Sequence, residues 1–217
     1  MFLRRTLLLQ LATCLTLLHN IHASLTDKAT GISFLPRIHT PNGELEITGV
    51  GVRKKGPIKV YSVGMYTTAA LKESLSQMSK VTEKIKALAT LRQGAGSTER
   101  PVSFLLEMSF KAGAEKMASA IADSVAPRHK GPVVDVENLK SLILEGVTSN
   151  TKDGIASKGT KFQFDCSGSG VGVSINGKGS GNVDSSSLSS AFCDVYLDDK
   201  AVSPALKQNC LDNCCQE

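Results

Sequence analysis

Tryptophan is absent from this chain, and aromatic residues make up only 5% of it. Histidine is also scarce, and two of the four histidines, His19 and His22, lie near the N-terminus. A base-stacking platform for nucleic acid needs aromatic side chains, while zinc sites and Ser-His-Asp triads usually need histidine. We therefore expect no nucleic-acid partner and no metal site. His39 and His129, near prolines in predicted loops, are interpreted as solvated.

The chain also lacks a hydrophobic run long enough to span a bilayer comfortably. Its apolar segment at residues 7–18 is interrupted by polar residues, follows Arg4 and Arg5, and precedes the small residue Ala23. This layout is typical of a secretory signal peptide. We expect residues 1–23 to be a signal peptide, residues 24–217 to form a single domain, and no stable membrane span to remain after cleavage.

A strong charge of one sign is missing as well. Loss of Arg4 and Arg5 lowers the formal net charge from +5 to about +3, and the remaining charges are spread along the sequence. The one dense basic cluster, Arg53-Lys54-Lys55, is interpreted as a solvated hairpin turn. The charge pattern alone therefore gives no argument for binding nucleic acid or an anionic membrane.

Cysteines remain in odd number once the signal peptide is removed. Entry into an oxidising compartment makes disulfides plausible and leaves one thiol over. No histidine follows His129, so the cysteine-rich tail is not interpreted as a zinc site. We expect a local disulfide in the tail to fasten the C-terminal helix. The five cysteines are Cys166, Cys193, Cys210, Cys214 and Cys215.

Common catalytic motifs are missing too. The glycine-rich segment 168–181 alternates like a strand and contains the hairpin turn Asn176-Gly177, whereas a dinucleotide-binding loop opens a helix. No serine stands in a Gly-x-Ser-x-Gly turn between a strand and a helix. The sequence therefore predicts no catalytic residue and no cofactor.

Hydrophobic periodicity predicts the order of elements. Strands are expected at residues 45–52, 58–67, 102–110, 161–164 and 170–175. Helices are expected at residues 69–91, 114–127, 135 to either 146 or 150, 186–196 and 204–214, after a leader at 24–42 that shows turn signals. Strands interleaved with helices in this order predict an α+β fold, in which helices cover one face of an antiparallel sheet.

One polar pair stands out in the strand-rich stretch 49–66, GVGVRKKGPIKVYSVGMY. A guanidinium among buried side chains needs an anionic or polar partner, and Arg53 and Tyr61 are the best candidates for a site. If Arg53 pairs directly with Ile58, Tyr61 points to the other face of the sheet. A register shifted by one residue brings Arg53 and Tyr61 together. The sequence leaves both registers open.

The same stretch resembles the chalcone isomerase superfamily. That superfamily has a glycine-rich strand ending in arginine and a following strand that closes in Gly-aliphatic-Tyr, here Gly64-Met65-Tyr66. Residues 117–128 and 187–207 are similar to a family helix and to its final helix pair. The resemblance covers roughly residues 31–210 and implies a chalcone isomerase-like fold.

The resemblance further implies the non-catalytic, fatty-acid-binding branch of this superfamily. Arg53 matches an arginine that both branches share, and Tyr61 stands where true isomerases have a threonine. Isomerases also carry a tyrosine and an asparagine in the segment matching 114–122, and a second threonine at the position of Val195; this chain has none of them. We therefore expect Arg53 and Tyr61 to hold the carboxylate of a fatty acid or similar amphipathic molecule.

The tail of such a ligand needs an apolar pocket, which we expect between the sheet and the helices. Two functional alternatives stay open: a divergent chalcone isomerase-type intramolecular lyase, and a secreted structural or interaction protein without a ligand. Secretion or retention in the endomembrane lumen is the expected localisation, with a two-part plastid targeting sequence as the alternative. The candidate pocket residues are Met65, Met117, Ile121, Phe192 and Val195.

Overall fold

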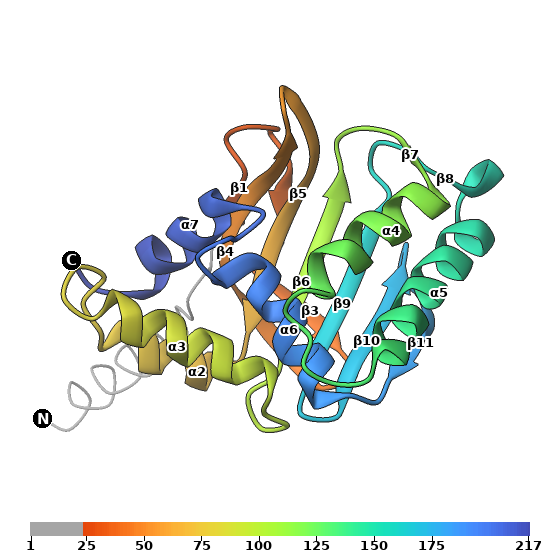
Figure 1. Cartoon of the computed structure of the whole chain (residues 1–217). Coiled ribbons are helices and arrows are strands. Elements are labelled where there is room, and N and C mark those ends of the chain that lie inside the picture. The colour runs from red at the N-terminus through yellow and green to blue at the C-terminus, as the bar shows by residue number, and fades with distance from the viewer. Residues whose placement is uncertain (1–23) are drawn as a thin grey trace, which may run out of the picture.

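The main element of the fold is a seven-stranded sheet (Figure 1). The computed structural model describes residues 24–217, and the predicted signal peptide lies outside them. Every neighbouring pair of strands is antiparallel, in the order β11-β10-β9-β6-β5-β4-β3. The strands are β3 (Arg37–Thr40), β4 (Gly43–Lys55), β5 (Ile58–Thr67), β6 (Val102–Met108), β9 (Lys161–Ser167), β10 (Gly170–Ile175) and β11 (Lys178–Val183).

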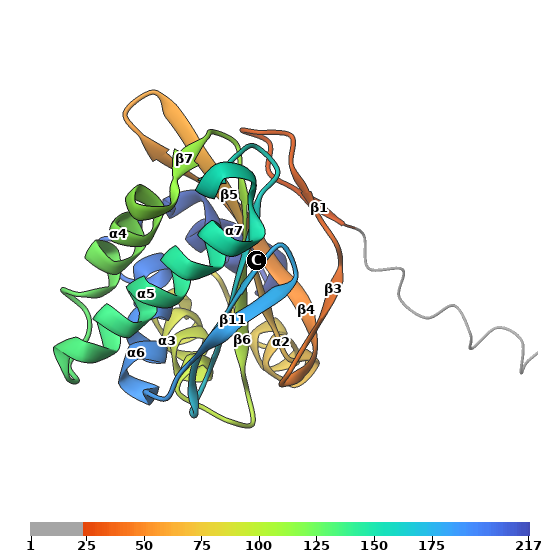
Figure 2. The same ribbon diagram turned by 90° about the vertical axis from the view of Figure 1, so that its right-hand side faces the viewer.

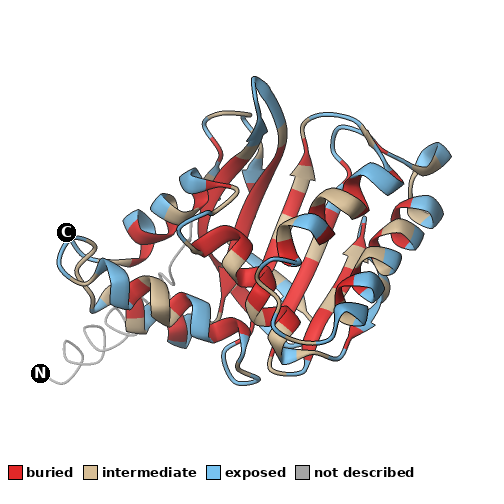
Figure 3. Cartoon of the chain, viewed as in Figure 1, coloured by how far each residue is buried: buried red, intermediate tan, exposed pale blue. Residues whose placement is uncertain are grey.

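The helices gather on one face of this sheet, as the two perpendicular views show (Figures 1 and 2). Their apolar sides and the inward side chains of the strands form the main core, and the middle of the sheet is accordingly buried (Figure 3). The predicted α+β fold with one helix-covered face is confirmed. The helices are α2 (Ala69–Ser76), α3 (Lys84–Ala95), α4 (Ala114–Val125), α5 (Val133–Asn150), α6 (Ser186–Leu197) and α7 (Pro204–Cys214).

The opposite face of the sheet is partly covered by the N-terminal segment. Here β1 (Leu25–Thr26) and β2 (Ser33–Phe34) form a two-stranded ladder, and β3 pairs with β4. Phe34 packs in a second, smaller core with Leu45, Ile47, Val50 and Tyr66. The expectation of a leader without strands over residues 24–42 was therefore wrong, because alternate β4 and β5 side chains point away from the helices and need an apolar cover.

Two glycines bring β4 into direct contact with α7. A Cβ atom at Gly49 would lie 2.7 Å from the backbone nitrogen of Cys210, and one at Gly51 would lie 2.7 Å from the Leu206 Cα. The Ser203 hydroxyl donates to the Val52 carbonyl at 3.0 Å and also caps α7. The glycines at the start of the 49–66 stretch thus let α7 pack directly against the backbone of β4. This contact fixes the position of the strand that carries Arg53.

The predicted helix over residues 69–91 is in fact two helices, α2 and α3. Between them, Ser79 forms a parallel bridge with Gln216 near the C-terminus. The backbone N–H of Gln216 donates to the Met78 carbonyl, and the Lys80 N–H donates to the Gln216 carbonyl, each at 2.9 Å. These bonds join residues far apart in the sequence, so the periodicity of residues 69–91 could not reveal the break between the two helices.

The predicted tail disulfide is not formed, and all five cysteines of residues 24–217 are free thiols. Cys210 and Cys214 lie on consecutive turns of α7 and both face the sheet. The Cys210 Sγ is 3.9 Å from the Thr48 hydroxyl, and the Cys214 Sγ is 3.5 Å from the Thr48 carbonyl. Burial raises the pKa of the Cys214 thiol to about 12. These thiols serve as small apolar groups under the helix.

Candidate functional site

A β-bulge places Arg53 directly opposite Tyr61. Lys55 pairs with Ile58 around the turn and Lys54 pairs with Lys59, and the register then shifts so that Arg53 pairs with Tyr61. The extra residue on β5 is Val60. An unbroken ladder from the same turn would place Arg53 opposite Val60, and the inserted residue corrects this by one position. The bulge therefore settles the register question in favour of a shared face.

Arg53, Tyr61 and Tyr196 form a short polar chain at the edge of the core. An Arg53 guanidinium N–H donates to the Tyr61 hydroxyl at 3.4 Å, and the guanidinium carbon lies 5.8 Å from the centre of the Tyr61 ring. The Tyr61 and Tyr196 hydroxyls are 3.0 Å apart. Both tyrosines are only 1% exposed, whereas Arg53 is half-buried. The two buried tyrosine hydroxyls are thus connected to the half-buried guanidinium of Arg53 by hydrogen bonds.

Among residues 24–217, no carboxylate lies within ion-pair distance of Arg53. Burial alone would lower the pKa of Arg53, but its contacts with Tyr61 and Tyr196 outweigh that effect and raise the pKa. Burial raises the pKa of Tyr196 well above its ordinary value. Arg53 is therefore charged and Tyr196 keeps its proton at neutral pH. Arg53 can therefore offer a cation to an anion, and Tyr61, whose hydroxyl lies 3.0 Å from that of Tyr196, can offer a hydroxyl donor.

A cleft of about 450 Å³ opens beside this group, between the β4–β5 hairpin, α4 and the connection from β6 to the short strand β7 (Ala112–Gly113). Val60, Phe110, Met117 and Ala120 supply an apolar wall. The volume is within the usual range for small-molecule sites. The complete lining is Arg53, Lys54, Lys55, Ile58, Val60, Tyr61, Phe110, Lys111, Ala112, Lys116, Met117, Ser119, Ala120 and Asp123.

Of the five predicted pocket residues, Met117 lies on the wall of this cleft. The other four, Met65, Ile121, Phe192 and Val195, are buried in the main core and are not part of its lining. Phe192 packs against other rings: its centroid is 4.5 Å from that of Phe164 and 5.7 Å from that of Phe104. These aromatic rings pack together between the sheet and the helices, and Phe192, one of the expected pocket residues, is among them.

Tyr196 is the site residue that sequence reasoning missed. It lies on α6, four residues after Phe192, and its ring stacks on Phe104 with centroids 4.8 Å apart. Residues four apart on a helix share a face. The predicted inward position of Phe192 was therefore the signal that could have placed Tyr196 next to Tyr61.

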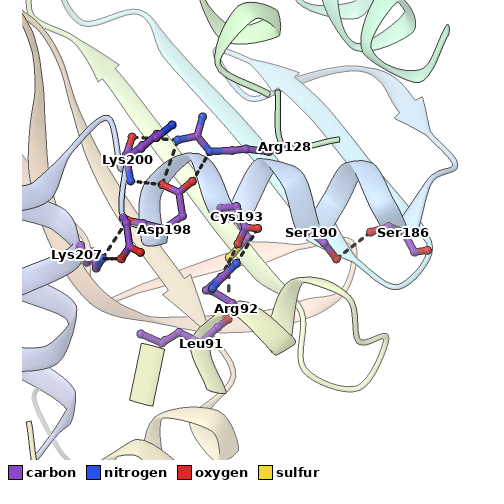
Figure 4. A network of polar contacts seen from close by, with 11 residues as sticks. Leu91, Arg92, Arg128, Ser186, Ser190, Cys193, Asp198, Lys200 and Lys207 are labelled. Carbon is purple, nitrogen blue, oxygen red and sulfur yellow. Dashed lines mark hydrogen bonds and ion pairs between the residues drawn. The ribbon is translucent and has the colours of Figure 1, made fainter. Parts of the chain in front are cut away.

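A larger cleft of about 620 Å³ lies between α3, α6 and α7. Its two arginines are already paired (Figure 4). Arg92 forms two bonds with the Asp194 carboxylate, at 2.5 and 2.9 Å. Arg128 forms two with Asp198, at 2.8 and 3.1 Å, and also donates to the Lys200 carbonyl. Since these guanidinium groups have carboxylate partners, the cleft beside Arg53 is the better candidate for an anionic ligand.

The side chain of His129 is buried, which corrects the expectation that it is solvated. Its side chain is 2% exposed. The Nδ1 atom lies 3.0 Å from the Ser187 hydroxyl, and Nε2 lies 3.1 Å from the Pro132 carbonyl and 3.2 Å from an Asp135 oxygen. These residue types match a catalytic triad, but here the ring is enclosed and joins the α4–α5 loop to α5 and α6. We interpret it as a structural link.

Replacing His129 with alanine is expected to lower the free energy of unfolding by about 2 kcal/mol, because the Ser187 and Asp135 side chains lose a buried partner. Urea unfolding followed by circular dichroism measures the change. His39→Ala is the matched control, since that side chain is 87% exposed, and its effect should stay within about 0.5 kcal/mol. Equal effects of the two substitutions would contradict the structural role of His129.

Residues 24–217 contain neither a metal-binding cluster nor a membrane-spanning helix. No group of three or more histidine, cysteine, aspartate or glutamate residues is arranged to hold a metal ion. No helix there has both the length and the apolar character needed to cross a membrane.

Fold and cleft together define an α+β protein with a helix-covered antiparallel sheet and a single uncompensated arginine facing a partly apolar cleft. The chain belongs to the chalcone isomerase-like family, because the sequence model of that family, described as "Chalcone isomerase-like", matches residues 26–212. The predicted family is thereby confirmed.

A solved structure with the same fold is that of a fatty-acid binding protein from Arabidopsis thaliana, AtFAP1. It superposes with a TM-score of 0.69 at 21% sequence identity, over 88% of this chain and 97% of that one. At this identity the likeness establishes the fold. A search of curated proteins gives no match.

Proposed function

We propose that this protein binds a fatty acid or a similar amphipathic carboxylate, without catalysis, in the cleft beside Arg53. The observation that carries the proposal is a half-buried guanidinium that faces the cleft without a carboxylate partner. A ligand carboxylate would accept charge-assisted hydrogen bonds from Arg53, which are stronger than bonds between neutral groups. The Arabidopsis protein with the same fold is named for fatty-acid binding, which supports this ligand class.

The two tyrosines complete the proposed carboxylate site. Tyr61 lines the cleft, and its hydroxyl is within hydrogen-bond distance of both Arg53 and Tyr196. If Tyr196 donates to Tyr61, the Tyr61 proton is free to point toward the ligand. Tyr196 would thus act by orienting a donor rather than by touching the ligand.

The cleft wall provides for the hydrocarbon tail. Val60, Phe110, Met117 and Ala120 present apolar surface next to Arg53, and each buried methylene contributes roughly 0.8 kcal/mol. The cleft is open, and the core behind it is filled by aromatic rings. We therefore infer that the tail runs along α4 and the β6–β7 connection instead of entering the core.

Native mass spectrometry of the freshly purified protein tests this proposal. We expect one fatty acid per chain, either copurified or taken up from a series running from dodecanoic to octadecanoic acid. Uptake of none of these acids would overturn the proposal and favour a protein without a ligand. Sustained conversion of a chalcone to a flavanone above the uncatalysed rate, lost on Arg53→Ala, would instead establish the isomerase alternative.

Tyr196→Phe is expected to weaken fatty-acid binding about five-fold, the equivalent of one ordinary hydrogen bond. The substituted ring can keep its stacking on Phe104, so the unfolding midpoint should change little. Titration with a fluorescent fatty acid in vesicle-free solution measures the affinity. Unchanged affinity in a stably folded variant would remove Tyr196 from the site.

A further inference from the structure

The rim of the Arg53 cleft is strongly basic in space, although the charges are scattered along the sequence. Lys54 and Lys55 come from the β4–β5 hairpin, Lys111 from the β6–β7 connection and Lys116 from α4. All four are exposed. Among residues 24–217, none of the four forms an ion pair with a carboxylate. Asp123 is the one carboxylate in the lining of the cleft.

Two large apolar side chains are exposed on the same rim. Phe110 is 50% exposed and Ile58 is 41% exposed. Ile58 follows the hairpin turn at Gly56-Pro57, and Phe110 precedes Lys111. Lysines that flank exposed phenylalanine and isoleucine are the combination that favours an anionic lipid surface, where apolar side chains enter the interface and cations meet lipid headgroups.

The shape of the molecule allows both segments to reach one flat surface. The hairpin tip and the connection between β6 and β7 project from the same end of the sheet, as both perpendicular views show (Figures 1 and 2). The hairpin tip is exposed (Figure 3). The cleft lies between these two projections and α4.

We propose that this rim docks the protein onto membranes that carry anionic lipids, with the mouth of the cleft facing the bilayer. The inference rests on the proposed function, since it gives the lysines and the exposed apolar pair a purpose at the entrance of a lipid site. A fatty acid leaving the bilayer then meets Arg53 without crossing bulk water. A nucleic acid or an acidic protein would also carry the negative charge that the lysines attract, but it would not explain why Phe110 and Ile58 are exposed beside them.

Cosedimentation of the ligand-free protein with vesicles tests the docking. We expect binding to vesicles of equimolar phosphatidylcholine and phosphatidylserine, and much weaker binding to vesicles of phosphatidylcholine alone. Each lysine near an anionic surface strengthens the partition roughly five-fold, so the double variant Lys54→Gln, Lys55→Gln should lose about 25-fold. The matched control is Lys84→Gln, Lys130→Gln, which removes the same charge from α3 and the α4–α5 loop and should bind nearly as the wild type does.

Phe110→Ser checks the apolar part, because it should weaken binding to the anionic vesicles while leaving the net charge unchanged. Equal partition of the wild type into both kinds of vesicle would overturn the docking proposal. Equal losses in the Lys54/Lys55 and the Lys84/Lys130 variants would also overturn it. Vesicle-free fatty-acid titration separates the two proposals: uptake without vesicle binding refutes the docking alone, while vesicle binding without uptake refutes the fatty-acid site.

Discussion

Gly51→Val is expected to abolish the native fold or to lower the free energy of unfolding by more than about 4 kcal/mol. A Cβ at this position would lie 2.7 Å from the Leu206 Cα and 2.8 Å from the Ser203 hydroxyl oxygen. The first of these atoms is helix backbone, so the clash is not relieved by rotating a side chain. The whole of α7 would have to move away from β4, and the bond from Ser203 to Val52 would break with it.

Soluble expression and urea unfolding measure this effect. Gly179→Val is the matched control, because a Cβ at Gly179, an exposed position in β11, would meet no atom within 4 Å. Valine suits an extended strand, so the control should unfold within about 1 kcal/mol of the wild type. Near-native stability of Gly51→Val would show that the close approach of α7 to β4 is not needed for folding.

The fold could be predicted from sequence because its determinants are largely local. A run of β-branched and aromatic residues predicted β5 with the bounds that the structure shows, and Ser203-Pro204 predicted the start of α7. The predictions that were wrong concern features held by contacts between segments far apart in the sequence. The break between α2 and α3 is held by the chain end at Gln216, and the burial of His129 is imposed by Ser187 on another helix.

In the candidate site, too, the features set by local sequence were predicted and those set by long-range contacts were not. Arg53 and Tyr61 were recognisable as a pair, but the bulge at Val60 that aligns them is a one-residue insertion with no signature in composition. Four of the five expected pocket residues lie in the core instead of in the cleft lining, because inward-facing apolar residues are the same types whether they line a cavity or fill a core. The basic rim was missed because Lys111 and Lys116 join Lys54 and Lys55 only when the sheet and α4 assemble.

Arg53→Gln is expected to weaken the binding of a fatty acid about 100-fold. Loss of a charge-assisted hydrogen bond in a partly buried site costs about 1.5–3 kcal/mol, and removing the only unpaired guanidinium in the cleft lies at the upper end of this range. Arg53→Lys should lose less, about 10-fold, because it keeps the charge but not the planar fork that can bind both carboxylate oxygens. Titration in vesicle-free solution measures these affinities.

Unfolding measurements and two controls distinguish loss of the Arg53–carboxylate contact from loss of the fold. Arg53 makes one long hydrogen bond, at 3.4 Å, to Tyr61, so Arg53→Gln should unfold at nearly the wild-type urea concentration. Arg100→Gln, which changes an exposed arginine, should bind as the wild type does.

The corresponding fatty alcohol supplies the control on the ligand side, because it has the tail without the carboxylate. If Arg53 recognises the carboxylate, its replacement should weaken acid binding strongly and alcohol binding hardly at all. Equal losses for acid and alcohol would mean that Arg53 shapes the cleft without recognising the charge, and an unchanged acid affinity would remove it from the site.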